Sequence, residues 1–451
     1  MNRYKNAREI LQRYLLGVIS FGFIAGLGVV PAFCAIEELY ALMPTLVTAR
    51  NIITNQDISV QEFEQIYREA KDNPDSDLSL LLPLCVTITQ KSSGKTTVLE
   101  WAALRGDANL VERLFAYDPD IMKQCEGESA LLHYATRQNH VNVAKILFRH
   151  GIALDAVKNG LTPLHISACY GCTEVAEFLL DNGAMVDLMG DKGWTPLYLA
   201  SVKNHLGVMF QLLHHGAKVD LGCGDIGYSA LHMAVVAKSV DGINLLLDHH
   251  ATIDVGSDGV GIRPLLVAVE NNFLKGAEVL LKRGAVVDHT YGGRTALFMA
   301  TQYDYADMAR LLLKYGANVN FIGEMGSSPL HMAAWFDSAD VAVALIQGGA
   351  AIDHPDEDGL TPLHWAVMRG KEKMVGVLLD HLAAVDLASN KGLTPLYYAV
   401  DKNYLPIARL LLDKGADVSK PSTSYALSTP LVHAFGVTTM DMFRLLWGYK
   451  R

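Results

Sequence analysis

The sequence predicts an all-α solenoid, in which short helix-turn-helix units stack one behind the next. A motif that recurs along the chain carries start and stop signals for two helices. One such unit cannot bury its own apolar faces, whereas stacked units can. The period is regular: a marker leucine in a Thr-Pro-Leu-His-like motif returns every 32–35 residues, at Leu99, Leu132, Leu164, Leu197, Leu231, Leu265, Leu297, Leu330, Leu363, Leu396 and Leu431.

The first helix of each unit begins at a threonine or serine. Thr361 can cap a helix through its hydroxyl, and Pro362 suits the first turn, where a missing N–H costs nothing. Leu363 and Ala366 then lie on one helical face, where the small alanine allows close packing against the next unit. This motif therefore predicts the start and the buried face of a helix.

The second helix, such as residues 175–180, ends at a position that usually holds glycine. A helix often stops at a residue in the left-handed conformation, which glycine adopts without strain. Two repeats have His250 and Leu382 at this position, where a left-handed backbone strains the side chain. The glycines are Gly183, Gly216, Gly284, Gly316 and Gly415.

This motif and its period resemble the ankyrin repeat family. The resemblance covers residues 95–451 in about eleven repeats, and its best copies begin at Thr162, Ser328 and Thr361. It implies an ankyrin-repeat solenoid whose helix-turn-helix units are joined by β-hairpin-like loops. In the family, the histidine after the marker leucine tethers neighbouring turns, which assigns a structural role to His133, His165, His232, His331 and His364. Leu266, Phe298 and Val432 replace it elsewhere, so packing must substitute there.

The flanks of the array suggest further parts. We interpret residues 36–94 as a small helical capping region or a degenerate extra repeat, because Ser59 and Glu62 form a capping-box pattern. Residues 95–451 form the ankyrin repeat array. Its last unit follows a longer connection and is truncated, as a capping repeat should be.

Residues 1–35 carry a targeting pattern. Basic residues precede an uncharged run at positions 15–36, which is long enough to cross a hydrocarbon core of roughly 30 Å. Ala32 and Cys34 fit the small-x-small rule of a signal peptidase site. Residues 1–35 are interpreted as a cleaved signal peptide, as an uncleaved N-terminal membrane anchor at residues 15–35, or as an apolar helix without a targeting role. We expect a protein that is exported through a signal peptide or anchored in the membrane.

Composition narrows the function. Half of the residues are hydrophobic, 19% are charged and the net charge is −10. A surface of that sign repels phosphate backbones, so we expect no nucleic-acid partner. The six cysteines are too few and too scattered for a disulfide scaffold.

Two nucleotide-binding motifs occur by chance. The first, at residues 94–96, matches the Gly-Lys-Thr end of a phosphate-binding loop. However, Thr89 stands where that loop needs a glycine, and Thr97 already serves as the first repeat's threonine. Residues 222–227 read GCGDIG, yet they lie in a hairpin tip and do not open a helix in a parallel β-α-β unit.

No catalytic or metal-binding pattern emerges. Cys169 and Cys172 have redox spacing but straddle a helix-helix turn without a second pair. The acidic tip from Asp353 to Asp358 has His354 where a calcium loop needs its first aspartate. We expect no enzyme, no cofactor and no small-molecule substrate. A small catalytic activity within residues 36–94 is an alternative that the residues there do not favour.

The ankyrin resemblance implies a protein-protein interaction scaffold that grips its partner with hairpin tips and first-helix faces along a concave groove. Aromatic and other large side chains stand at positions without a packing role in the family, and such residues dominate interface energies. The predicted partner-binding residues are Tyr170, Trp194, Tyr228, Tyr303, Trp335, Phe336, Met368 and Arg369. An alternative hypothesis is a bacterial effector-type ankyrin protein that acts on host proteins.

The targeting hypothesis makes a prediction. Replacing Ile19 and Ile24 with aspartate should retain the protein in the cytoplasm, because each charge costs roughly 3 kcal/mol at the centre of a membrane helix. Cell fractionation measures the outcome. An unchanged distribution of the double variant would refute the targeting role.

Overall fold

The computed structural model describes residues 67–68, 88–90, 94–124, 129–222, 227–256, 261–423 and 428–449. The chain divides into two compact units, Met1–Val186 and Asp187–Arg451, which are described separately below. The predicted targeting segment and most of the predicted capping region lie outside the described residues. Within the described residues, no helix is both long and apolar enough to cross a membrane.

Unit 1 begins with a short β-hairpin and continues as helix pairs. Strand β1 (Ile88–Gln90) pairs antiparallel with β2 (Gly94–Thr96), so the described end of the region expected to be helical is a hairpin. Tyr67 packs edge-to-face on Trp101, with ring centres 5.4 Å apart. The helices are α5 (Val98–Arg105), α6 (Ala108–Tyr117), α7 (Ser129–Arg137), α8 (Val141–Arg149), α9 (Pro163–Tyr170) and α10 (Thr173–Asp181), with a 3₁₀ turn at Ile121–Gln124.

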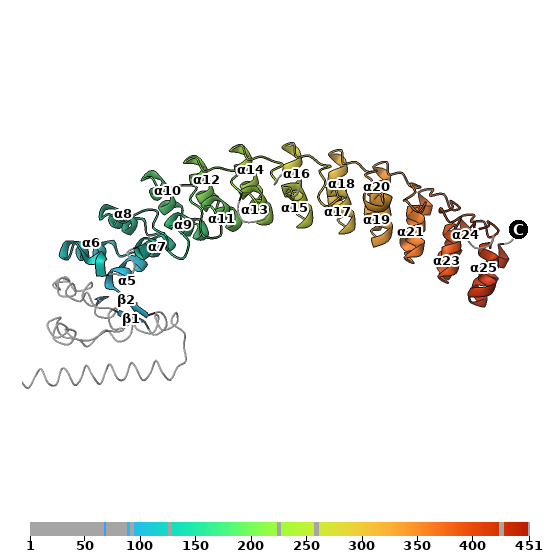
Figure 1. Ribbon diagram of the computed structural model, residues 1–451, viewed down its shortest axis with the longest axis horizontal. Coiled ribbons are helices and arrows are strands. Elements are labelled where there is room, and N and C mark those ends of the chain that lie inside the picture. Colours follow the sequence, from blue (N-terminus) through green and yellow to red (C-terminus); the bar gives the residue numbers. More distant parts are fainter. Residues whose placement is uncertain are drawn as a thin grey trace, which may run out of the picture. The chain divides into compact units, whose positions relative to one another are not determined.

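Unit 2 repeats the same helix pair along its length. Its first helices form one row and its second helices another, and each helix packs on its counterpart in the next repeat (Figure 1). The pairs are α11 (Pro196–Lys203) and α12 (Leu206–His214), α13 (Ala230–Val236) and α14 (Val240–Asp248), α15 (Pro264–Glu270) and α16 (Leu274–Lys282), α17 (Ala296–Gln302) and α18 (Ala306–Lys314), α19 (Pro329–Phe336) and α20 (Ala339–Gln347), α21 (Pro362–Met368) and α22 (Glu372–Asp380), α23 (Pro395–Asp401) and α24 (Leu405–Asp413), and α25 (Pro430–Val437) and α26 (Met440–Gly448). The predicted all-α array of helix-turn-helix units is confirmed.

The predicted helix starts and core leucines are confirmed. Thr361 is the N-cap of α21, where its side chain accepts a hydrogen bond from the His364 N–H, and Pro362 is in the first turn. The eleven marker leucines are all buried. The connections are hairpin-like, since Lys158 and Leu161 exchange backbone hydrogen bonds, as do Tyr291 and Arg294.

The histidines after the marker leucines connect consecutive repeats. In His331, Nδ1 accepts from the Ser328 N–H at 3.1 Å, and Nε2–H donates to the Leu360 carbonyl of the next repeat at 2.9 Å. His364 makes the same pair of bonds, reaching the Leu393 carbonyl at 3.1 Å. Both nitrogens are used, one as an acceptor, so the ring must be neutral. The tether that the ankyrin resemblance implied is present.

A second tether, made by aspartate, also recurs. Asp353 accepts two hydrogen bonds from the Ala384 N–H, at 3.0 and 3.2 Å, across to the next repeat. The same bond joins Asp155 to Met185, Asp187 to Lys218, Asp220 to Thr252, Asp254 to Val286, Asp288 to Asn318, and Asp386 to Asp417, while Asn320 serves Ala351. Each of these bonds joins a side chain of one repeat to a backbone atom of the next, in addition to side-chain packing.

Leu382 allows the backbone strain at a left-handed helix stop to be tested. It adopts the left-handed conformation (φ 68°), in which most of its counterparts are glycines, and its side chain is 87% exposed. Leu382→Gly should raise the free energy of unfolding by up to about 1 kcal/mol. The relief of strain, about 1–2 kcal/mol, exceeds glycine's entropic cost of roughly 0.5–1 kcal/mol. Urea unfolding measures the change.

Gly415 provides the matched control. It has φ 91°, and a Cβ there would meet nothing within 4 Å, so Gly415→Leu introduces strain without a clash at Cβ. It should destabilise by a similar amount. If Leu382→Gly unfolds at lower urea than the parent chain, the strain argument is wrong.

The neutral histidine tethers predict a pH dependence. Burial lowers the pKa of His331 and of His364 to about 4, against 6.5 in an unfolded chain. Between pH 6.5 and 4 the unfolded chain therefore binds more protons, and stability falls as the pH falls through that window. The loss should reach about 3 kcal/mol per histidine at pH 4, since one pKa unit corresponds to about 1.4 kcal/mol.

Denaturant unfolding from pH 7 to 4 measures this slope. In the repeat of α15, the buried Leu266 occupies the position of these histidines. The double variant His331→Leu with His364→Leu therefore places a side chain there that the array already accommodates. That double variant should be less stable at pH 7 and lose less stability towards pH 4. An unchanged slope would show that other groups control the acid response.

Candidate protein-binding surface

The last turn of α19 presents two large aromatic side chains. Ala333 and Ala334 are fully buried, whereas Trp335 is 37% and Phe336 43% exposed. The helix ends at Asp337, which takes the left-handed conformation (φ 68°). Because the alanines hold the other face of the helix against the array, the two rings lie at its accessible edge.

Trp335 belongs to a cluster that spans two repeats. Its ring meets the ring of Trp365 edge-to-face, with centres 5.3 Å apart. The Arg369 guanidinium lies 4.2 Å from the centre of the Trp335 ring, a cation–π geometry. Trp365 Nε1–H donates to Asp356 at 2.8 Å, and Asp356 also accepts from the Leu360 N–H at 2.8 Å. We call Trp335, Trp365, Arg369 and Asp356 the tryptophan cluster.

The cluster changes the expectation for Trp335. The sequence predicted an interface residue without a packing role, but the ring also packs against the next repeat. Phe336 lies beside Trp335 in the sequence and is exposed, as the sequence predicted. Truncating Trp335 should therefore cost some stability, because aromatic pairs contribute about 0.5–1.5 kcal/mol beyond area burial. Phe336 is the cleaner probe of binding.

Neighbouring repeats extend this surface on both sides. Tyr303, just after α17, is exposed and lies near Tyr305, with ring centres 5.6 Å apart. Met368 is half-buried at the end of α21, and Arg369 beside it is exposed. Five of the predicted residues, Tyr303, Trp335, Phe336, Met368 and Arg369, thus come from three consecutive repeats of unit 2.

Tyr228 lies in the hairpin tip before α13 and folds back on its own repeat. It is half-buried, and its ring stacks on His232 with centres 4.9 Å apart. Burial raises the pKa of the phenol, as do the nearby Glu270 carboxylate and Tyr291. The phenol therefore stays neutral, close to an acidic side chain of the following repeat.

Trp194 and Tyr170 each pair with a basic side chain. Trp194 stacks on Tyr198 (6.3 Å between centres), and the Lys192 ammonium lies 4.9 Å from the Trp194 ring centre. Tyr170 is exposed, with the Arg137 guanidinium 5.1 Å from its ring centre. Tyr170 belongs to unit 1 and Trp194 to unit 2, so each is a separate candidate contact.

Sequence reasoning missed Trp365. It stands two positions after its marker leucine, and its ring is half-buried. The available signal was its residue type, because Trp101, Tyr134 and Tyr398 are also aromatic at this position, whereas the other repeats have an aliphatic side chain, a methionine or, in the last repeat, a histidine.

The segments that resembled a phosphate loop, a calcium loop and a redox motif in the sequence have other roles or surroundings in the structure. Thr97 caps α5 through a capping box with Glu100, and Gly94–Thr96 is strand β2, so no phosphate loop exists there. Asp353 accepts a backbone N–H bond in the aspartate tether. Burial raises the pKa of the Cys172 thiol, which makes it a poor nucleophile. Among the described residues no group of His, Cys, Asp and Glu could hold a metal ion.

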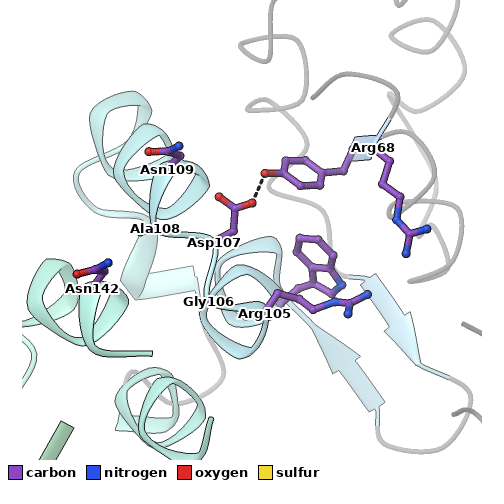
Figure 2. Close-up of a pocket in the computed structure, with 9 residues that line it drawn as sticks. Arg68, Arg105, Gly106, Asp107, Ala108, Asn109 and Asn142 are labelled. Carbon is purple, nitrogen blue, oxygen red and sulfur yellow. Dashed lines mark hydrogen bonds between the residues drawn. The ribbon is translucent and has the colours of Figure 1, made fainter. Parts of the chain in front are cut away.

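A polar recess of about 600 Å³ lies at the first repeat of unit 1 (Figure 2). The Tyr67 hydroxyl donates to Asp107, and Asp107 also accepts from the Leu110 N–H as the cap of α6. Burial and the Asp107 bond raise the pKa of Tyr67. With the carboxylate engaged in these structural bonds, the recess does not present a paired nucleophile and base.

Family comparison agrees with this architecture. The model of ankyrin repeats in three copies matches residues 70–158, 99–189, 153–223, 186–258, 267–356 and 330–422. The chain therefore belongs to the ankyrin repeat family.

Individual relatives match over shorter stretches. Human ankyrin repeat and SOCS box protein 16 is 36% identical over 97 residues, 22% of this chain and 21% of that protein. The putative ankyrin repeat protein FPV031 of fowlpox virus is 35% identical over 97 residues, 21% of this chain and 28% of its own length. The putative palmitoyltransferase ZDHHC13 of Danio rerio is 31% identical over 119 residues, 26% and 18% of the two chains. In each case the match spans under a third of the relative. Ankyrin repeats and these relatives support a protein-protein interaction scaffold.

Proposed function

We propose that this protein is a non-enzymatic scaffold that binds a partner protein across α17, α19 and α21. The observation that carries the proposal is the exposed pair of aromatic side chains at the end of α19, beside the tryptophan cluster. Exposed apolar groups of this kind usually mark a contact site, and Trp, Tyr and Arg are the residue types enriched at binding hot spots.

The surface suits a partner that inserts an apolar side chain. Asp356 and Arg369 hold the two tryptophan rings in place, so little side-chain entropy is lost on binding. Phe336 and Tyr303 supply adjacent ring surface from α19 and from the end of α17. Arg369 adds a positive charge at the edge, which favours an acidic group next to the partner's apolar anchor.

We also propose that residues 1–35 direct the protein to a membrane, either as a cleaved signal or as an anchor at residues 15–35. The support is the uncharged run preceded by basic residues. In either case the partner would be encountered outside the cytoplasm or at the membrane.

Binding provides the test. Partners are first captured on the purified chain and identified, and their affinities are then measured by calorimetry. Trp335→Ala with Phe336→Ala should weaken binding by about 2 kcal/mol or more, roughly thirtyfold, as truncation of hot-spot residues does. Phe336→Ala alone should weaken binding while moving stability by only about 0.5 kcal/mol.

Phe210 is the matched control. It is 49% exposed on the second helix α12, away from the proposed surface, so Phe210→Ala should bind as the parent chain does. Unchanged affinity of the Phe336→Ala variant for every captured partner would place the binding surface elsewhere, first at the tips around Trp194, Tyr228 and Tyr291.

A further inference from the structure

The last repeat of unit 2, α25 and α26, exposes a continuous apolar face. Val432, Phe435, Met440 and Trp447 are 62%, 81%, 66% and 58% exposed. The helices themselves are firmly placed: the Tyr449 hydroxyl donates to Asp413 of the preceding repeat, and Leu446 is fully buried. These side chains are therefore exposed on a folded repeat.

The positions of these residues identify the face. Val432 and Phe435 follow their marker leucine by one and four residues. Their counterparts in the two preceding repeats are buried: His364 and Val367, then Tyr397 and Val400. His364 reaches the Leu393 carbonyl of the next repeat, so these positions face the following repeat.

Helix α26 shows the same pattern. Phe443 and Trp447 correspond to Ala408 and Leu412 of α24, which are buried. The rings form a continuous row. Phe435 meets Phe443 edge-to-face, with ring centres 5.8 Å apart, and Phe443 stacks on Trp447, with ring centres 5.7 Å apart. Met440, Phe443 and Trp447 lie on one stripe of the helix, at i, i+3 and i+7.

This face differs from the capping repeat expected from the sequence. A repeat that ends an array in water needs a polar outer face. Here the four positions that pack against a following repeat carry one valine and three aromatic residues. The face occupies the positions that form the repeat-to-repeat contacts inside unit 2.

We propose that a second copy of this chain covers this face, so that two arrays pair end to end about a two-fold axis. A two-fold contact must be self-complementary. Asp441 and Arg444, both exposed, form an ion pair with each other at 3.6 Å and flank the apolar stripe on one side of α26. In an antiparallel α26–α26 contact, each Asp441 would approach the Arg444 of the other copy.

The size of the face fits a dimer. Burial of Val432, Phe435, Met440 and Trp447 would remove roughly 500 Å² of apolar surface per copy, more than half of the about 800 Å² per partner in a standard interface. The two flanking charges cancel, which does not favour an anionic membrane surface as the occupant.

Sedimentation equilibrium of the purified full-length chain tests the pairing. The chain should be a dimer, and Phe435→Glu with Trp447→Glu should raise the dimer Kd at least tenfold. Because both side chains are exposed, the circular dichroism spectrum at room temperature should show an unchanged helical fold, even if the lost contacts with Phe443 lower the melting temperature. Phe210→Glu is the control for an exposed phenylalanine elsewhere and should leave the dimer intact.

Charge reversal tests the two-fold geometry. Asp441→Arg should weaken the dimer, and Asp441→Arg combined with Arg444→Asp should restore it, because the swapped pair is again complementary across the axis. These variants leave the tryptophan cluster untouched, so partner binding there should not change. The pairing can therefore fail without affecting the proposed function.

Three results would overturn the proposal. One is a monomeric chain at the highest soluble concentration. Another is a dimer that Phe435→Glu with Trp447→Glu leaves intact. The third is a monomer that co-sediments with phosphatidylcholine vesicles and loses that binding in the double variant, which would assign the face to a lipid surface.

Discussion

The array depends on one recurring hydrogen bond, from a buried neutral histidine to a carbonyl of the next repeat. At His331 and His364 the ring accepts from its own helix N-cap and donates across the repeat boundary, so one side chain fixes both the helix start and the spacing to its neighbour. Such buried polar groups are stabilising only when both nitrogens are satisfied. That requirement explains why the same threonine or serine precedes each of these histidines.

The aspartate tether acts in the same way on the hairpin side. Asp353 and its counterparts accept a backbone N–H from the next repeat, so the boundary between α21 and α23 has two polar connections around an apolar contact. Two repeats that lack the histidine keep the aspartate. Asp254 and Asp288 belong to repeats with Leu266 and Phe298 at the histidine position, and those side chains are buried in its place. Packing and one remaining tether hold these boundaries.

Because the tethers and marker leucines hold each repeat, other positions are free to vary. Most first helices are followed by a left-handed residue, such as Asp304 after α17 and Asp337 after α19, and the residue just before it is exposed in these two repeats. This freedom permits Phe336 and Tyr303 to be aromatic and exposed. The same logic applies at α25 and α26, where positions that normally pack on a following repeat display Phe435 and Trp447.

Much of the fold could be read from the sequence, because its determinants are local. Helix starts at Thr361, stops at Gly415 and even the left-handed Leu382 follow from nearest-neighbour chemistry. The period located every buried marker leucine. The candidate site was predictable only in part. The sequence indicated Trp335, Phe336 and Arg369 as neighbouring surface residues, since their positions follow from the repeat.

Tertiary structure decided how these residues meet. Trp365 joins Trp335 only because α19 and α21 pack side by side, and Asp356 reaches Trp365 only because the hairpin folds back over its own helix. The aspartate tether could not be predicted from the sequence either. Its donor is a backbone N–H about one repeat away, and a backbone N–H does not depend on residue type. Sequence alone thus determined the repeated unit and its boundaries, because those depend on contacts within a few residues. The tethers, the cluster and the exposed C-terminal face depend on contacts between repeats, which exist only once the array has formed.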